Sequence, residues 1–312
     1  MILEITHSVI VPVYQNSASI DQLVDALIVL ADSLEGNFEA VFVVDGSPDD
    51  SAAKLFARFP NDHISSQILQ LSRNFGAFAA IRVGLEAARG KYVAVIAADL
   101  QEPPELLKSF FNKLRDGSCD IVIGRRTSRH DAAISSFMAR IYWRFYTKVI
   151  NRDIPNGGVD VFACKDSVAK QLSGLSEGNT SLIGLLFWVG FRRDFVDYAR
   201  LARPYGQSSW TIKKKFKYLA DSIFAFTDLP IVVLQIIGIL GIVISTILGI
   251  IVLVGSISGS ISAPGYTTLM IVILASTSGI LLGLGVVGSY AWRAYENGKN
   301  RPNAIIMKRD VD

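Results

Sequence analysis

The sequence predicts an α/β domain with a mostly parallel sheet, followed by amphipathic helices and a pair of helices that cross a membrane. In the first half of the chain, short apolar runs alternate with helical patterns, which is typical of parallel strands wrapped by helices. Residues 229–292 then form a run of 64 residues without Asp, Glu, Lys or Arg. A run of this length is enough for two crossings of a hydrocarbon core about 30 Å thick.

The alternating elements follow one another from the N-terminus. Each expected strand is a short run rich in Val, Ile, Leu, Phe or Ala, bounded by turn-forming residues such as Asp, Gly, Pro or Ser. Each expected helix has apolar residues three and four positions apart. We expect strands at residues 8–14, 38–44, 67–71, 92–98 and 120–124, separated by helices at residues 17–34, 51–58, 77–89 and 103–115.

Polar side chains stand at the ends of four of these strands, namely Tyr14, Asp45, Asp99 and Arg125. The carboxyl ends of parallel strands meet at one edge of a sheet, and ligands of α/β proteins bind beyond that edge. The sequence therefore predicts a ligand site there. Asp45-Gly46-Ser47 is a weak signal by itself, because such a turn is also ordinary structural punctuation.

Residues 99–104 (DLQEPP) carry a sharper signal. Asp99 and the amide of Gln101 could present oxygens to Mg²⁺ or Mn²⁺, which prefer to bridge a carboxylate and nucleotide phosphates. The alternative is that Asp99 caps the helix that opens near Pro103. After the strand at 120–124, Arg125, Arg126 and Arg129 either hold phosphates or are solvated. The histidines and cysteines show no spacing typical of a metal site.

Charge is unevenly distributed along the 312 residues, although 31 basic and 28 acidic residues give a net charge of only +3. Residues 1–199 carry −3, residues 200–228 carry +4 and residues 293–312 carry +2. The 50% hydrophobic content excludes a disordered chain, and the small net charge argues against a dedicated nucleic-acid binder. With only Cys119 and Cys164, a disulfide scaffold is excluded as well.

The uncharged run divides at a turn of small residues, 256–265, into spans at about 231–255 and 266–292. As helices these spans are roughly 37–40 Å long. Basic residues flank the pair on both sides, whereas the turn has no charge, so we expect both flanks and the N-terminal domain to face the cytoplasm. We expect no signal peptide at the N-terminus. The basic flanking residues are Lys213, Lys214, Lys215 and Lys217 before the pair and Arg293, Lys299 and Arg301 after it.

The segment before the first span has an apolar stripe with spacings of 4, 3, 4 and 3 residues: Ile212, Phe216, Leu219, Ile223 and Phe226. With lysines on its other faces, it suits a helix lying on anionic lipid headgroups. The alternative is a helix that packs its stripe on the catalytic domain. Residues 135–150 have a similar pattern and predict a second such helix.

Five motifs, in this order, resemble family 2 glycosyltransferases of GT-A fold: residues 9–14 (VIVPVY), 44–47 (VDGS), 71–77 (LSRNFGA), 98–105 (ADLQEPPE) and 124–126 (GRR). More narrowly, the chain is similar to polyisoprenyl-phosphate glycosyltransferases, namely bactoprenol glucosyltransferases and their dolichol-phosphate mannose synthase relatives. Residues 157–162, 188–191, 198–203 and 205–210, together with Arg301-Pro302, fit the same pattern.

The resemblance implies a role for individual residues. The nucleotide sugar is expected at Pro12, Tyr14, Asp45, Arg73, Asp99 and Arg125; Mg²⁺ or Mn²⁺ at Asp99 and Gln101; the acceptor phosphate at Arg200, Arg203 and Ser208; and the reacting centre at Asp160 and Asp99. Two departures weaken the match. Many relatives have Asp-Ala-Asp where this chain has Ala97-Ala98-Asp99, and many have a second Asp where it has Val44.

The resemblance also implies an activity, namely the inverting transfer of a hexose to a polyprenyl phosphate such as undecaprenyl phosphate. The first candidate for the hexose is glucose, with UDP-glucose as the donor. The expected enzyme is a multi-pass protein of the cytoplasmic membrane and a homo-oligomer. We expect residues 1–199 to be catalytic, 200–228 a basic juxtamembrane segment, 229–292 the two spans and 293–312 a basic tail. The alternatives are a GDP-mannose-dependent mannosyltransferase and a non-catalytic module that binds nucleotide sugar or lipid.

Overall fold

The computed structural model describes residues 4–61, 63–127, 153–155, 159–175, 177, 180–201, 212–258 and 265–311. The strands are β1 (Ile5–Val13), β2 (Asn37–Val44), β3 (Ser65–Leu71), β4 (Tyr92–Val95), β5 (Ile121–Arg126), β6 (Phe162–Lys165), β7 (Arg193–Tyr198) and β8 (Ile306–Val311). The helices are α1 (Ile20–Asp32), α2 (Ser51–Arg58), α3 (Ala77–Ala87), α4 (Glu105–Arg115), α6 (Asp166–Gly174), α7 (Leu182–Trp188), α8 (Ile212–Phe226), α9 (Leu229–Ile257) and α10 (Tyr266–Gly298).

One eight-stranded sheet, in the order β7-β5-β6-β4-β1-β2-β3-β8, forms the centre of the domain. β1 pairs in parallel with β2 and β4, β2 with β3, and β5 with β7. β6 runs antiparallel between β4 and β5, and β8 runs antiparallel to β3. The expected mostly parallel sheet is thus confirmed.

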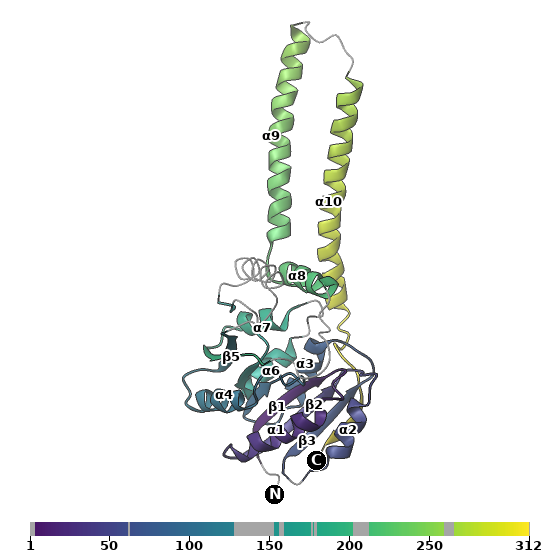
Figure 1. The fold of residues 1–312 in the computed structure, drawn as a ribbon. Coiled ribbons are helices and arrows are strands. Elements are labelled where there is room, and N and C mark those ends of the chain that lie inside the picture. Colours follow the sequence, from purple (N-terminus) through teal and green to yellow (C-terminus); the bar gives the residue numbers. More distant parts are fainter. Residues whose placement is uncertain are drawn as a thin grey trace.

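Helices cover both faces of the sheet (Figure 1). Alternation along β1 sends Val9, Val11 and Val13 into the core shared with α1, α2 and α4, and Ile10 into the core shared with α3, α6 and α7. Both cores consist mainly of buried aliphatic and aromatic side chains. Because β1, β2, β4, β5 and β7 run in the same direction, their carboxyl ends meet at one edge of the sheet, here called the strand-end edge.

Each of the nine elements expected between residues 8 and 124 is present. The clearest difference in bounds is at β4, which ends at Val95, whereas the sequence predicts a strand to residue 98. The backbone amide of Ile96 still donates to the carbonyl of Ile10 at 3.1 Å. The chain then leaves the sheet, and the carbonyl of Ala98 accepts a hydrogen bond from the hydroxyl of Ser19 at 2.7 Å. This departure brings Asp99 beyond the strand-end edge.

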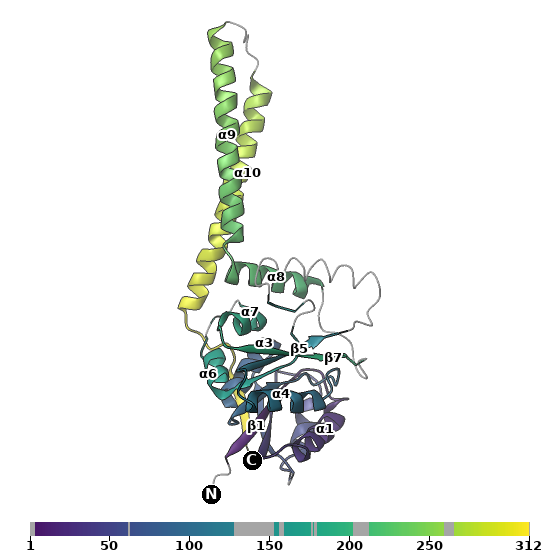
Figure 2. The ribbon, with the colours of Figure 1, turned by 90° about the vertical axis from the view of Figure 1, so that its left-hand side faces the viewer.

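The helices α9 and α10 project together from the α/β domain, and α8 lies between them and the domain (Figures 1 and 2). Within the part of the chain that the structure describes, one segment, Leu229–Leu248, is long and apolar enough to cross a membrane, with a mean hydropathy of 2.8. None of that segment is buried. A second helix, α10, lies beside α9 (Figure 2). It begins at Tyr266 and continues to Gly298, six residues past the predicted end of the second span at residue 292.

The described half of α8 packs on the domain. Leu219 and Phe226 of the predicted stripe contact the core shared with α3, α6 and α7. Gly184 of α7 allows the contact, because a Cβ there would lie 2.3 Å from Cε2 of Phe226. On another side of α8, Asp221 accepts a 2.8 Å hydrogen bond from Arg293 of α10. Leu219 and Phe226 therefore follow the alternative in which the helix packs its apolar stripe on the catalytic domain. The second amphipathic helix expected at 135–150 lies outside the described residues.

The end of the chain returns to the sheet, where the sequence predicts only a basic tail. β8 pairs with the outer edge of β3, from Gln67 opposite Val311 to Leu71 opposite Ile306. Arg309 donates to the side-chain oxygen of Gln67 at 3.0 Å, and the Lys308 ammonium lies 3.9 Å from the ring centroid of Phe56. β8 covers an edge of β3 that would otherwise expose unpaired backbone groups. Both chain ends consequently lie on the domain, away from the far end of α9 and α10 (Figure 1).

Candidate active site

The loops after β1 and β2 are joined by hydrogen bonds to backbone amides. The hydroxyl of Ser47 accepts from the amide of Gln15 at 2.7 Å, and the carboxylate of Asp49 accepts from the amide of Ser17 at 3.0 Å. The hydroxyl of Ser51 accepts from the amide of Asn16 at 3.2 Å. These contacts fix the loop that carries Tyr14, one of the residues expected at the nucleotide. Pro12 and Tyr14 are half-buried at this end of β1.

Asp45 is 2% exposed and binds the loop that follows β3. One carboxylate oxygen accepts from the amide of Phe75 at 2.7 Å, and the other accepts from the amide of Gly76 at 2.8 Å. Burial raises the pKa of Asp45, and these two amides and the charge of Arg73 oppose that rise. The carboxylate therefore fixes the position of a loop, a role that the sequence does not predict. Its expected contact with the nucleotide stays a prediction.

The same loop presses against the turn after β2. Gly46 has a φ of +58°, and a Cβ there would lie 2.3 Å from the carbonyl carbon of Arg73 and 2.4 Å from the backbone nitrogen of Asn74. Any other residue would push the two loops apart. Arg73 itself is exposed, and its guanidinium carbon lies 4.0 Å from the ring centroid of Phe75. Arg73 is thus accessible to a ligand at the strand-end edge.

Asp99 and Gln101 lie beyond the end of β4 in a local turn. Leu100 has a φ of +58°, and Asp99 accepts from the backbone amide of Gln101 at 3.3 Å. Gln101 makes two hydrogen bonds with Leu201: its carbonyl accepts from the Leu201 amide at 2.9 Å, and its side-chain amide donates to the Leu201 carbonyl at 3.3 Å. α4 starts after Pro104, whose own side chain makes no capping hydrogen bond, and the alternative in which Asp99 caps this helix stays a prediction.

Five side chains meet next to this turn and form what we call the ionic cluster: Glu102, Arg126, Asp160, Tyr198 and Arg200. Arg126 forms an ion pair with Asp160, and the Tyr198 hydroxyl donates to the same Asp160 oxygen at 3.2 Å. Arg200 Nε lies 3.3 Å from Glu102 Oε1. The cluster thus joins the loop after β4 to the ends of β5 and β7.

The cluster shifts the ionisation of its own members. Burial raises the pKa of Glu102, and Asp99 raises it further, whereas Arg200 and Arg126 lower it. Burial lowers the pKa of Arg126, and the neighbouring charge of Arg200 lowers it further. Burial and the charge of Glu102 raise the pKa of Tyr198. Two arginines and three carboxylates, counting Asp99, therefore share a small and partly buried volume.

The structure brings Arg126 to the cluster rather than Arg125, the residue that the sequence assigns to the nucleotide. Successive residues of β5 point to opposite faces of the sheet, so Arg125 lies on the face away from the cluster and its expected contact with the nucleotide stays a prediction. Arg125 is exposed and makes two contacts with Asp197, at 2.5 and 3.0 Å. Gly124 faces the cluster side, where a Cβ would lie 3.0 Å from Cε1 of Tyr198.

Sequence reasoning also missed Glu102 and Tyr198 as members of the cluster. For Glu102 a signal was present, because it is a charged residue within the otherwise recognised DLQEPP segment. Arg200 and Asp160 lie in the cluster, and their expected roles at the acceptor phosphate and the reacting centre stay predictions. Arg203 and Ser208, which were assigned to the acceptor phosphate, lie outside the described residues.

The donor set at Asp99 fits a divalent cation only if a substrate supplies further ligands. Among the residues that the structure describes, no group of three His, Cys, Asp or Glu side chains could hold a metal ion. Mg²⁺ often binds through one or two carboxylates, several waters and substrate phosphates. Asp99 and Gln101 are compatible with that mode.

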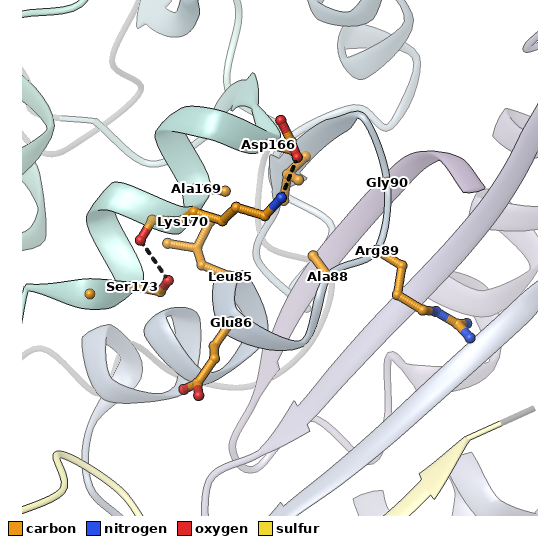
Figure 3. Close-up of a pocket in the computed structure, with 11 residues that line it drawn as sticks. Leu85, Glu86, Ala88, Arg89, Gly90, Asp166, Ala169, Lys170 and Ser173 are labelled. Atoms are coloured by element: carbon orange, nitrogen blue, oxygen red, sulfur yellow. Dashed lines mark hydrogen bonds and ion pairs between the residues drawn. The ribbon is translucent and has the colours of Figure 1, made fainter. Parts of the chain in front are cut away.

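A cleft of about 580 Å³ lies elsewhere, between α3 and α6 (Figure 3). Its lining includes Arg89 and Gly90, which precede β4, and Asp166, which follows the antiparallel β6. It therefore lies at the strand-start edge of the parallel strands, opposite to the ionic cluster. Two ion pairs lie at this cleft: Lys170 pairs with Asp166 at 2.7 Å, and Arg89 pairs with the buried Glu39 at 2.7 Å.

Comparison with known proteins gives the class of this protein. Residues 8–170 match the family described as Glycosyl transferase family 2. The chain belongs to this family and has its GT-A fold with a mostly parallel sheet, so it is a family 2 glycosyltransferase. The resemblance stated from the sequence motifs is confirmed at this level.

Individual relatives extend over nearly the whole chain. The chain is 32% identical to the uncharacterized glycosyltransferase YkcC of Bacillus subtilis (strain 168), over 97% of this chain and 94% of that one. It is 29% identical to the SfII prophage-derived bactoprenol glucosyl transferase of Shigella flexneri, over 96% of this chain and 97% of that one. Glucosyl-3-phosphoglycerate synthase from Mycobacterium tuberculosis, solved with Mn²⁺, UDP-glucose and phosphoglyceric acid, aligns over 64% of this chain and 73% of its own, with 17% identity and a TM-score of 0.48.

Proposed function

We propose that this glycosyltransferase transfers a hexose, with UDP-glucose as the first candidate donor, to a polyprenyl phosphate such as undecaprenyl phosphate. The observation that carries the proposal is the ionic cluster, in which Arg126 and Arg200 lie together at the strand-end edge. Paired arginines suit phosphate recognition, because their forked donors match phosphate oxygens. Similarity along the whole chain to proteins named bactoprenol glucosyl transferase supports a polyprenyl phosphate as the acceptor.

We propose further that α9 and α10 form a transmembrane hairpin. The path of the chain supports this. The chain leaves the domain through α8 and returns to the same sheet as β8, so both ends of the hairpin lie on one side. A single crossing by α9 would therefore require α10 to cross back. The basic flanks place the domain at the cytoplasmic face, and in this arrangement the enzyme is a multi-pass membrane protein, expected to be a homo-oligomer.

The chemistry needed is a single displacement. A phosphate oxygen of the acceptor forms a bond to the anomeric carbon of the sugar. The bond from that carbon to the donor diphosphate breaks, the configuration inverts, and the nucleoside diphosphate leaves with the electron pair. The acceptor phosphate is already anionic near pH 7, so no strong general base is required.

Asp160 then orients or desolvates the acceptor. Its ion pair with Arg126 and its hydrogen bond from Tyr198 fix the position of the carboxylate. Arg126 and Arg200 stabilise phosphate charge during the displacement. Asp99 and Gln101 are the residues that would hold Mg²⁺ or Mn²⁺, which would supply neutralisation of the diphosphate charge.

Two other functions remain to be separated from this one. A GDP-mannose-dependent polyprenyl-phosphate mannosyltransferase would use the same acceptor chemistry, and a non-catalytic module would bind nucleotide sugar or lipid without transfer. The loss of a carboxylate at Ala97 relative to many similar proteins is the feature that favours the second alternative.

The test is incubation of the purified full chain in detergent with undecaprenyl phosphate and a panel of radiolabelled nucleotide sugars. We expect sugar to enter the lipid fraction with one donor, UDP-glucose first, and to require a divalent cation. Transfer from GDP-mannose alone would identify the mannosyltransferase. Binding of donors without transfer of any sugar would overturn the proposal in favour of the module.

A further inference from the structure

Glu102 is a buried charge that the reaction outlined above does not use. Its side chain is 0% exposed. Within the described part of the chain, neither of its carboxylate oxygens accepts a hydrogen bond from another residue. Burying a carboxylate is costly unless other charges or donors compensate. Neighbouring positive charges must therefore compensate the buried carboxylate of Glu102.

The compensating charges are those of the two arginines around Glu102. Arg200 Nε lies 3.3 Å from Glu102 Oε1, and Arg126 is close enough to lower the pKa of the same carboxylate. The two guanidinium groups repel each other, since the charge of Arg200 lowers the pKa of Arg126. Glu102 is thus the negative charge that both arginines share, and it offsets their repulsion.

Both arginines also keep hydrogen-bonding capacity in reserve. Arg126 Nε and Arg200 Nε are buried and have no hydrogen-bond partner among the described residues. Arg126 is already tied to Asp160 through a different nitrogen, Nη2. Arg200 Nε faces Glu102 Oε1 at 3.3 Å but does not form a hydrogen bond with it. Two buried donors that lack an aligned acceptor, on adjacent cations, are a poor structural ion-pair network but a suitable cradle for a phosphate group.

We propose that Glu102 is a positioning residue that holds Arg126 and Arg200 side by side for a phosphate group of a substrate. The inference rests on the proposed function and adds a residue to it. The phosphate belongs either to the lipid acceptor or to the donor diphosphate, and the two sources are separated by which substrate responds to substitution. Arg200 directly precedes Leu201, which is hydrogen bonded to Gln101, so the cradle adjoins the turn that carries Asp99.

The experiment compares Glu102→Gln with Glu105→Gln in the full chain in detergent. Gln keeps the shape of the side chain and removes the charge. Glu105 is a matched control, because it is an exposed carboxylate three residues further on, in the first turn of α4. Three quantities are measured for each variant: KM for undecaprenyl phosphate, KM for the donor nucleotide sugar, and kcat.

We expect Glu102→Gln to raise the KM for one phosphate substrate by about tenfold or more, as the loss of charge-assisted contacts predicts. A rise for undecaprenyl phosphate alone assigns the cradle to the acceptor, and a rise for the donor alone assigns it to the diphosphate. We expect kcat to stay within about threefold, and Glu105→Gln to match the wild type. Glu102→Asp, which keeps the charge on a shorter side chain, is expected to restore part of the affinity.

Titration calorimetry with UDP and with inorganic pyrophosphate provides a readout that needs no turnover. If the wild type binds these probes but transfers no sugar, the proposed function fails while the binding arm still tests the cradle. The inference is overturned if the folded Glu102→Gln variant keeps both KM values and its UDP affinity within about twofold of the wild type. It is also overturned if only the melting temperature and kcat fall. Should Glu102→Gln not fold, the same limits apply to Glu102→Met, which also removes the charge and has a side chain of similar length.

Discussion

At the ends of β1 and β2, carboxylates and hydroxyls accept hydrogen bonds from backbone amides, whereas at the ends of β4, β5 and β7 charged side chains pair with one another. Asp45 binds two amides of the loop after β3, and Asp49 binds an amide of the loop after β1. In the ionic cluster, by contrast, Glu102, Arg126 and Arg200 all have buried polar atoms that find no hydrogen-bond partner among the residues the structure describes.

The difference between the β1–β2 end and the ionic cluster indicates how each region is arranged before a ligand binds. Backbone amides that are satisfied within the protein hold their loops in one conformation before any ligand binds. Buried charges without full hydrogen bonding are costly and gain most when a charged ligand completes them. We therefore expect substitutions at the β1–β2 end to change stability together with donor affinity, and substitutions in the ionic cluster to change catalysis or substrate affinity with less change in stability.

The largest expected effect is that of Asp160→Asn. Asn keeps a hydrogen-bond acceptor for Tyr198 but cannot neutralise Arg126. We expect kcat to fall on the order of 10²-fold, the loss typical when a substrate is no longer held in its reactive position. Sugar transfer to undecaprenyl phosphate gives kcat, and titration with UDP gives nucleotide affinity.

Nucleotide affinity serves as the internal control for this variant. If UDP binding is unchanged while turnover falls, the effect is confined to the reacting centre. Near-normal turnover with intact nucleotide binding would refute a catalytic role for Asp160 and would leave the ionic cluster as a structural network.

The next effect is that of Asp45→Asn, at the other half. Asn offers one acceptor oxygen where Asp45 offers two, so the amide of Phe75 or of Gly76 loses its partner and faces an NH₂ group. We expect the free energy of unfolding to fall by about 1–3 kcal/mol and the donor KM to rise together with it. Chemical denaturation and donor kinetics measure the two quantities.

Asp50→Asn is the matched control for this substitution. Asp50 is exposed at the N-terminus of α2, and its side chain makes no capping hydrogen bond. We expect it to behave as the wild type in both assays. A loss of turnover in Asp45→Asn without any loss of stability would contradict this expectation. It would mean that Asp45, at the β1–β2 end, acts in the reaction rather than by holding a loop in place.

A smaller effect on the donor KM is expected from deleting residues 305–312, which removes β8. The amide of Ser72 donates to the carbonyl of Ile305 at 2.9 Å, just before the loop that Asp45 holds. Removing this contact exposes the edge of β3, and we expect a donor KM a few-fold higher and a loss of about 1 kcal/mol for each broken hydrogen bond. Met307→Ala, at a side chain that is 62% exposed, is the control and should leave both values unchanged. An unchanged donor KM in the deletion would show that β8 acts on stability alone.

The sequence predicted the sheet well because its information is local. Apolar runs such as residues 38–44 and the turn residues after them do not depend on distant partners. The pairing of β8 with β3 is different, since it joins residues 306 and 71, which are far apart in the sequence, and a charged segment such as 306–311 does not read as a strand. Only the folded chain brings it to the edge of β3.

The site was predicted in part for the same reason. Asp45, Asp99 and Asp160 were recognised by their places in local motifs, and all three lie at the strand-end edge. Which of two adjacent arginines points to the cluster depends on the phase of β5, which the motif GRR does not reveal. The burial of Glu102 between two arginines likewise arises only when β5 and β7 are paired.

The smallest expected effect, that of Arg125→Ala, tests this assignment of phase. The ion pair of Arg125 with Asp197 is about half exposed on both sides, at 53% and 48%. Exposed ion pairs contribute little to stability, so we expect a small loss of stability and a donor KM within about twofold of the wild type. Arg126→Ala, one residue on, should instead weaken phosphate binding by about tenfold or more, since it removes a charge-assisted donor from the cluster. A tenfold rise of the donor KM in Arg125→Ala would show that the nucleotide also contacts the opposite face of the sheet. The donor site would then include Arg125 together with its ion-pair partner Asp197.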